Sequence, residues 1–179
     1  MRHMGKQGLV ALVALATAAL GGVALAQEPV SALKGHNSNA PIDVASDRVE
    51  VQDRTDRAVF AGNVQVRQAQ LTLETERLTV AYTSAGGLQI DRLDAAGGVV
   101  VRSPTETARG NFGVYDINRR IITLVGAVRL ERGGSNLSGA RLTIDLATGR
   151  AVVDGGAAGI GQSGGRVTGR FTVPQRTGG

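Results

Sequence analysis

The segment Val59-Phe60-Ala61-Gly62-Asn63-Val64 decides the fold of this chain, because its pattern recurs three more times. In each copy a short apolar run breaks at a glycine and resumes with valine or alanine; the other copies are Ala95-Ala96-Gly97-Gly98-Val99, Thr123-Leu124-Val125-Gly126-Ala127-Val128 and Val152-Val153-Asp154-Gly155-Gly156-Ala157. The glycines at positions 62, 97, 126 and 155 are 35, 29 and 29 residues apart. Near-constant spacing of one strand-like unit is typical of chains that stack repeated turns of β-sheet.

The glycines in these segments also predict the shape of the sheet. A glycine on the apolar side of a strand usually marks a bulge, a sharp bend or the close approach of another backbone. Bends at matching positions would crease the sheet along its length, whereas four unrelated bulges would not. The regular spacing favours the crease, but the residues alone leave both interpretations open.

Alternation of apolar and polar residues begins at Pro41 and continues along the chain. Val49 and Val51 alternate with polar neighbours, and the same two-residue period recurs through Leu142 and Ile144. Asp, Asn and Gly cluster between these runs, at 53–56, 84–87, 115–118, 132–136 and 147–149, as tight reversals require. We therefore predict an all-β fold with about a dozen or more short antiparallel strands and one buried face.

Residues 1–26 have the parts of a secretory signal peptide. Arg2 and Lys6 open the segment, residues 8–26 are uncharged and largely apolar, and Ala24-Leu25-Ala26 forms a small-x-small end. We predict cleavage after Ala26, followed by a flexible lead (27–40), one β domain (41–173) and a flexible tail (174–179). An uncleaved membrane anchor is the alternative, because a span of about 18 apolar residues is near the lower limit for crossing a bilayer.

The composition excludes several classes of partner and chemistry. Without the predicted signal peptide, 18 basic and 15 acidic residues remain, a formal charge of +3, and arginines stand beside acids rather than in a basic run. Few aromatic residues are present for stacking on bases, so we do not expect nucleic-acid binding. The chain has no cysteine, which excludes metal–thiolate sites, and we expect neither a metal nor a cofactor.

The sequence offers little support for an enzyme. His36, the only histidine after the predicted signal peptide, lies in the lead. Ser103-Pro104 and Ser135-Asn136 are turn signals rather than a nucleophile elbow. Acid pairs such as Asp43 with Asp47, or Glu74 with Glu76, alternate with apolar neighbours and read as exposed strand positions. We therefore predict no catalytic residues.

A set of ordered motifs covers about residues 41–156: Pro41-Ile42-Asp43-Val44-Ala45-Ser46-Asp47-Arg48-Val49, Phe60-x-Gly62-Asn63-Val64-x-Val66, Gly110-x4-Tyr115-Asp116, Ile122-x-Leu124-x-Gly126-x-Val128 and Asn136-Leu137-Ser138-Gly139-x2-Leu142-Thr143-Ile144-Asp145-Leu146-x2-Gly149-Arg150. With these motifs the chain resembles the LptA, or OstA-like, family of periplasmic lipopolysaccharide-export proteins. Two copies of the repeat carry Gly97-Gly98 and Gly126-Ala127 where the family has glycine-asparagine.

The resemblance implies a taco-like, creased β-jellyroll in the periplasm whose apolar interior shields the acyl chains of lipid A. It also implies partners: lipopolysaccharide, inner-membrane anchored and outer-membrane components of the same bridge, and further copies stacked head to tail. Stacking would use unpaired edge strands, for which we expect strand positions near both ends of the domain: Ile42, Val44, Val167 and Phe171.

The candidate lipid-binding residues are the apolar positions that we expect to face inward. Such a residue is more often plain core than the wall of a ligand groove, and the pattern does not separate the two because both demand the same side chains. Arg48 or Arg67 at a rim could pair with a lipid phosphate, although a solvated face explains them as well. The candidates are Val49, Phe60, Val64, Val66, Leu78, Val80, Val99, Val101, Phe112, Val114, Leu124, Val128, Leu142 and Ile144.

Three functions stay open at this point. The first is a lipopolysaccharide-binding bridge protein that performs no chemistry. The second is a related bridge component whose N-terminal segment stays in the inner membrane. The third is a structural β-solenoid that polymerises around a solid, ligand-free core.

Overall fold

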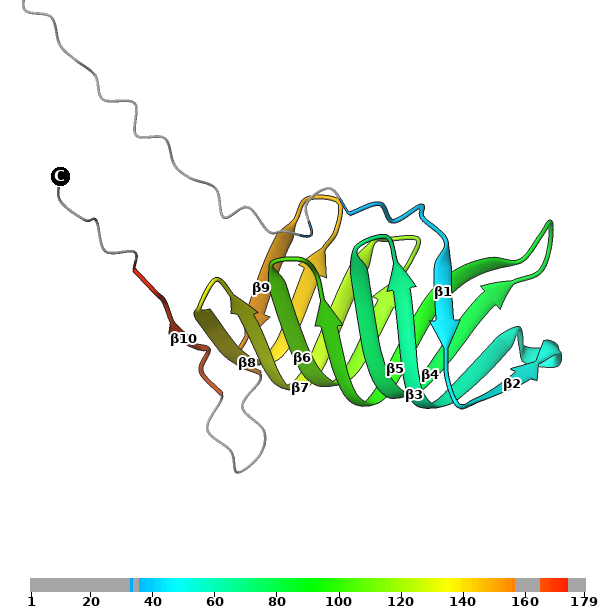
Figure 1. The fold of residues 1–179 in the computed structure, drawn as a ribbon, viewed down its shortest axis with the longest axis horizontal. Helices are drawn as coiled ribbons and strands as arrows, with labels where there is room; N and C mark the ends of the chain where they lie inside the picture. The colour runs from blue at the N-terminus through cyan, green and yellow to red at the C-terminus, as the bar shows by residue number, and fades with distance from the viewer. Residues whose placement is uncertain (1–32, 34–35, 157–164, 174–179) are drawn as a thin grey trace, which may run out of the picture.

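The computed structural model describes Leu33 and residues 36–156 and 165–173, so the predicted signal peptide and tail lie outside the described residues. These residues form ten β-strands and one short 3-10 turn, η1 (Asp53–Thr55), as Figure 1 shows. The strands are β1 (Ile42–Ala45), β2 (Arg48–Gln52), β3 (Arg57–Gln68), β4 (Leu71–Thr83), β5 (Gln89–Arg102), β6 (Glu106–Asp116), β7 (Ile121–Arg132), β8 (Ser135–Asp145), β9 (Arg150–Asp154) and β10 (Thr168–Arg170).

The strands form one antiparallel meander that is folded lengthwise into two leaves. β3 to β8 pair in chain order, β1 and β2 both pair with β3, and β9 and β10 both pair with β8. β2 pairs with residues 57–61 of β3 and β1 with residues 65–68, so β1 and β2 act as two halves of one long strand. Leaf 1 consists of β1, β10 and the halves of β3–β8 that lie between them in the sheet. Leaf 2 consists of β2, β9 and the halves of β3–β8 that lie between those two strands. This arrangement is an antiparallel jellyroll and not a β-solenoid.

The crease between the leaves lies at the repeated glycines. In β3, β5 and β7 two successive residues have positive φ, and the pairs are Gly62-Asn63, Gly97-Gly98 and Gly126-Ala127. The first residue of each pair is glycine because a Cβ there would lie 2.5 Å from Asp47 Oδ2, 2.7 Å from Glu76 Cβ or 2.8 Å from Asn111 Nδ2, respectively. The aligned crease expected from the spacing is therefore confirmed.

The second residue of each pair has more room than the first. Nothing lies within 4 Å of a Cβ built at Gly98, which explains why asparagine and alanine occupy the equivalent positions in β3 and β7. Asn63 uses its side chain to donate a hydrogen bond to Asp47 Oδ2 at 2.8 Å. The Asp47 amide also donates a hydrogen bond to the Gly62 carbonyl at 2.9 Å. Together the two bonds hold the break between β1 and β2 against the crease.

The even-numbered strands cross the crease differently. The register of β4 shifts between Glu74 and Arg77, and that of β6 shifts between Arg109 and Phe112. The buried positions change parity there, from Thr75 to Leu78 in β4. Thr75 is buried at this bend and donates its hydroxyl hydrogen to the Ala96 carbonyl at 2.8 Å.

The fourth copy of the repeat interrupts a strand instead of bending it. β9 ends at Asp154, Gly156 has the positive φ of 82°, and the backbone of Gly155 lies against that of Gly165. β10 then pairs with the other half of β8, so β9 and β10 are also two halves of one strand. The prediction of about a dozen or more short strands is wrong in this detail, because β3–β8 run unbroken through the crease at 11 to 14 residues each.

The described residues contain no helix that is long and apolar enough to span a membrane.

Apolar side chains from both leaves meet in a single core, in which the largest fully buried residues include Leu78, Leu93, Ile122, Leu124 and Leu142. Two hairpins show the expected turn chemistry: Gly133 and Gly134 supply both positive-φ residues between β7 and β8, and Asp145 Oδ1 accepts from the amides of Ala147 and Thr148 after β8.

Candidate functional site

The candidate site is the apolar space between the two leaves. Ten of the fourteen predicted residues lie in the core at 5% exposure or less, and Phe60 packs against that core. The ten are Val64, Val66, Leu78, Val80, Val99, Val101, Leu124, Val128, Leu142 and Ile144. Their side chains fill the central part of the interior, so the structure brings these residues together as a packed core.

Val49 is less buried than the sequence predicts. It pairs with Phe60 on the inner side of leaf 2, but 53% of its surface is exposed, and every residue of β2 is exposed. The reason is its place in the sheet, since β2 has a neighbouring strand on one side only. Val49 is therefore part of the open end of the jellyroll and not of the core.

The prediction that Phe112 and Val114 face inward is wrong. Phe112 is 57% exposed and pairs with Val125 on the outer surface of leaf 2, whereas Tyr115 is buried. The inner positions of β6 at the crease are glycines, because a Cβ at Gly113 would lie 2.9 Å from Leu124 Cδ2. The parity change at the crease turns the large side chains of this segment outward, as the register shift between Arg109 and Phe112 requires.

An open cleft of about 750 Å³ lies at the C-terminal end of the interior. Its walls come from β7, the β7–β8 turn and β8 on one side, and from β9 with the residues before it on the other, and they include the apolar side chains of Leu130, Leu137, Ala151 and Phe171. The volume is within the range of ligand pockets, roughly 300–1,000 Å³. None of the fourteen predicted residues lines this cleft, because their alternation identifies buried strands rather than the end of a sheet.

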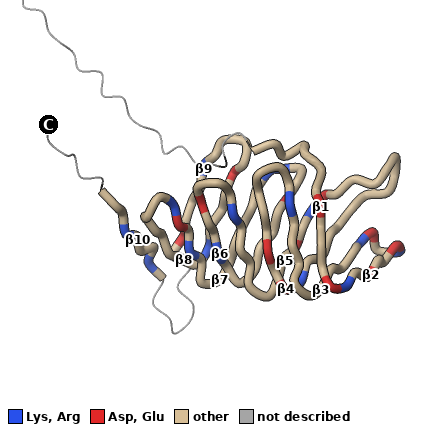
Figure 2. Tube along the Cα trace, viewed as in Figure 1, with Lys and Arg blue, Asp and Glu red and all other residues tan. Residues whose placement is uncertain are grey.

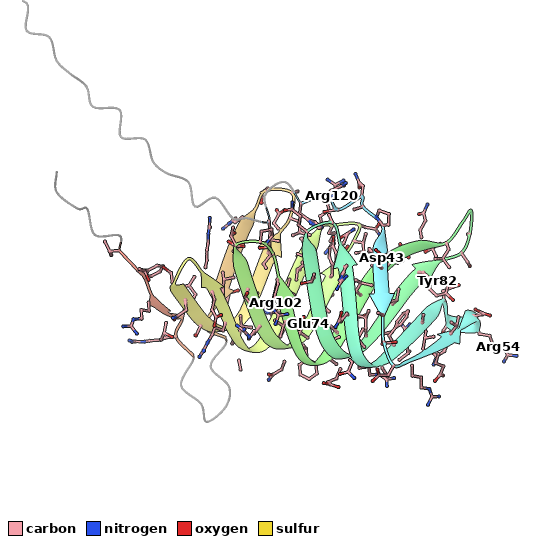
Figure 3. All side chains as sticks on the ribbon, in the orientation of Figure 1. Asp43, Arg54, Glu74, Tyr82, Arg102 and Arg120 are labelled. Carbon is pink, nitrogen blue, oxygen red and sulfur yellow. The ribbon has the colours of Figure 1, made fainter. Side chains whose placement is uncertain are left out.

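Charged groups stand at the rim of the cleft. Glu106 is buried and lies 3.3 Å from Arg132, whose side chain is 42% exposed, and Arg150 stands on the opposite leaf. Elsewhere charges of both signs are interleaved along the strands, as Figure 2 shows. Figure 3 shows one such pair, Glu74 and Arg102, which lie 2.6 Å apart on neighbouring strands. Arg48 and Arg67, the predicted rim arginines, are both exposed and do not line the cleft.

A buried polar network joins the leaves on the side opposite the crease, which we call the mouth. Tyr115 of leaf 2 donates its hydroxyl hydrogen to Gln68 Oε1 of leaf 1 at 2.8 Å. Gln68 is 2% exposed, and its amide donates to the carbonyls of Ser38 at 2.9 Å and Ala40 at 3.1 Å. Burial raises the pKa of Tyr115 above its ordinary value, although the neighbouring Ser38 and Arg120 act in the opposite direction, so the phenol stays protonated as a donor near neutral pH.

No group of acidic residues and histidine suited to holding a metal occurs among the described residues. One member of each acid pair considered in the sequence has a structural partner: Asp47 accepts a hydrogen bond from Asn63, and Glu74 forms an ion pair with Arg102. His36 lies against Gln68 with its Nε2 3.1 Å from Oε1. Ser135 accepts a hydrogen bond from the Thr172 amide at 3.1 Å.

The predicted edge residues lie at the two ends of the sheet. Ile42 and Val44 of β1 pack partly against the core, while Val167 and Phe171 flank β10 at 42% and 69% exposure. β1 and β2 at one end, and β9 and β10 at the other, each have one unpaired side within the described residues.

The sequence profile of the LptA/(LptD N-terminal domain) LPS transport proteins matches residues 43–150, which cover the strands from β1 to the start of β9. The chain belongs to this family. An uncharacterised protein of Rhizobium meliloti (strain 1021) is 31% identical over 154 residues, which cover 81% of this chain and 83% of that protein.

The fold also matches a solved structure. The crystal structure of LptH, the LptA-homologous periplasmic component of the lipopolysaccharide transport device of Pseudomonas aeruginosa, superposes with a TM-score of 0.66 at 18% identity. The match covers 77% of this chain and 99% of the LptH chain. The resemblance read from the motifs is therefore confirmed, and the all-β jellyroll is the fold of the LptA family. The family is one of transport proteins.

Proposed function

We propose that this chain is a periplasmic bridge protein that holds the acyl chains of lipid A between its leaves while lipopolysaccharide moves from the inner to the outer membrane. The observation that carries the proposal is the two-leaf apolar interior of an LptA-family chain, which opens at its C-terminal end as a cleft of about 750 Å³. Leu130, Leu137 and Phe171 give that cleft apolar walls. Arg132 and Arg150 at its rim suit an anionic headgroup.

The interior residues are proposed to contact lipid when the leaves separate. Two of the predicted candidates, Val101 and Ile144, line a small void that shares Glu106 and Leu130 with the cleft. Phe112 and Val114 are excluded from this proposal because they face outward. The predicted signal peptide supports delivery to the periplasm, with cleavage after Ala26; an intact N-terminus in the purified protein would favour the membrane-anchored alternative.

Lipid binding can be tested with a charge placed in the cleft. Leu137→Asp should weaken the binding of purified lipid A at least ten-fold, because an acyl chain would then contact a carboxylate. The matched control is Phe112→Asp, which places the same charge on the outer surface at a 57% exposed position. Equal affinities for the two folded variants would refute the assignment of the cleft.

We further propose that copies associate head to tail through their open edges. Residues 42–56 hold five acidic and two basic residues, while the described residues of 150–173 hold three basic and one acidic residue. These opposite charges favour pairing of the β1/β2 end with the β9/β10 end by strand addition. The same edges could accept the inner-membrane anchored and outer-membrane components of the bridge.

The association can be tested by blunting one edge. Val51 is 60% exposed on β2, so Val51→Lys should reduce concentration-dependent association measured by analytical ultracentrifugation without unfolding the protein. Phe112→Lys is the matched control, because Phe112 is a 57% exposed apolar residue on β6, a strand that is paired on both sides within the sheet. Association that resists Val51→Lys and high salt would contradict the edge assignment.

A further inference from the structure

The segment before β1 crosses the mouth of the jellyroll. Leu33 and residues 36–40, which we call the strap, lie between the predicted signal peptide and the first strand, and Figure 1 shows residues 36–41 along the upper rim leading into β1. The strap is held by its own short turns, in which the amides of His36, Ser38 and Ala40 donate to carbonyls two or three residues earlier at 3.1 Å. Its composition shows no periodicity from which this position could be predicted.

Gln68 fastens the strap and both leaves together. The side chain stands on leaf 1, accepts from Tyr115 of leaf 2, and donates to two strap carbonyls. His36 of the strap is a fourth partner at 3.1 Å. A buried amide left without partners would destabilise the closed state, so these contacts specify a closed mouth with the strap in place. An aliphatic residue at position 68 would fill the same space without any link to the strap.

Leu33 occupies the apolar interior itself. Only 4% of its surface is exposed, and it lines a small void of about 10 Å³ together with Val101 and Ala108 of leaf 1 and Ile144 of leaf 2. That void and the open cleft share Glu106 and Leu130 as lining residues. Leu33 therefore lies at the inner end of the cleft, where an apolar chain that extends from the cleft toward the core would be placed.

We propose that the strap is an internal competitor of the lipid: Leu33 occupies an acyl-chain position in the empty protein, and an entering acyl chain displaces it and opens the Gln68 network. This inference rests on the proposed function. It assigns Leu33, Gln68 and Tyr115 to the regulation of loading and not to the walls of the cleft.

The sequence supplies a clean reporter, because it contains no cysteine. Leu33→Cys places a single thiol in the buried position, and its rate of modification by a thiol reagent should rise at least ten-fold when purified lipid A is added. Leu88→Cys, at a 71% exposed position, should react rapidly and equally with and without lipid A. An unchanged rate for the Leu33→Cys thiol while lipid A is shown to be bound would overturn the strap proposal.

Affinity gives an independent readout. Leu33→Ser and Gln68→Leu both remove contacts that hold the strap, so each should bind lipid A several-fold more tightly than the unmodified chain. A residue with a merely structural role would weaken binding when substituted, and weaker or equal binding by both folded variants would refute the proposal. The proposed function is tested separately by equilibrium binding to the unmodified chain: if lipid A does not bind at all, that function falls and the strap proposal falls with it.

Discussion

The crease can be tested at two adjacent glycines that differ in the space available to a Cβ atom. Gly97 and Gly98 both have positive φ, 89° and 82°, but a Cβ at Gly97 would lie 2.7 Å from Glu76 Cβ, whereas a Cβ at Gly98 meets nothing within 4 Å. Substituting alanine at either position forces an L-residue into the left-handed region at a cost of about 1–2 kcal/mol. Only Gly97→Ala adds the close contact.

The magnitude follows from these two contributions. Overpacking typically costs about 1–3 kcal/mol, and replacing glycine returns about 0.4–1 kcal/mol by restricting the unfolded chain. We therefore expect Gly98→Ala to lower the free energy of unfolding by about 1 kcal/mol and Gly97→Ala by about 2–4 kcal/mol. Gly98→Asn should cost less than Gly98→Ala, because asparagine, whose short polar side chain can hydrogen-bond locally, tolerates the left-handed region better than alanine.

Urea unfolding followed by far-UV circular dichroism measures these differences in one buffer. The three variants should keep the slope of the unmodified protein and differ in midpoint, with Gly97→Ala the lowest. Equal midpoints for Gly97→Ala and Gly98→Ala would refute the reasoning, because the contact with Glu76 would then have no energetic consequence.

Three further predictions concern the core, the mouth and the surface. Ile144→Asp should unfold the domain, lowering the free energy of unfolding by more than about 4 kcal/mol, because Ile144 is 1% exposed and the carboxylate would be buried without a partner. Circular dichroism of the purified variant measures this, with Phe112→Asp as the control. An Ile144→Asp variant that stays folded would contradict the prediction. Burial raises the pKa of Tyr115, so the contribution of this residue to stability is full below about pH 10 and is lost as the pH rises through the folded pKa. Tyr115→Phe should therefore reduce the loss of stability at alkaline pH, measured as the free energy of unfolding against pH. The same pH profile for the variant and the unmodified protein would count against this prediction. Arg102→Ala should lower the free energy of unfolding in urea by less than about 1 kcal/mol, because the side chains of Arg102 and Glu74 are 41% and 47% exposed. A larger loss would mean that solvent does not screen this ion pair.

The crease could be predicted from the sequence because it depends on local chemistry. Gly62, Gly97 and Gly126 have positive φ and no space for a Cβ, so the bend in each strand can be predicted from that strand's own residues. The two-residue period likewise placed Leu124 and Leu142 in the core, because a strand with one buried face alternates regardless of its neighbours.

Other features depended on partners that the sequence does not show. Phe112 was placed inward because alternation does not reveal a register shift, and the shift in β6 follows from the packing of Gly113 against Leu124. The cleft could not be found from periodicity because its apolar lining, such as Leu137 and Phe171, comes from the end of the sheet. The strap has no pattern of its own and is fixed by its short turns, by the burial of Leu33 and by its contacts with Gln68.

The most direct test of the account is native mass spectrometry of the full chain expressed with its N-terminal segment and purified from the periplasm of a Gram-negative host. The account predicts a chain that begins at Gln27 and carries lipid A at near-stoichiometric yield, which Leu137→Asp removes and Phe112→Asp does not. A folded protein that carries no lipid, and binds none when purified lipid A is added, would contradict the central claim.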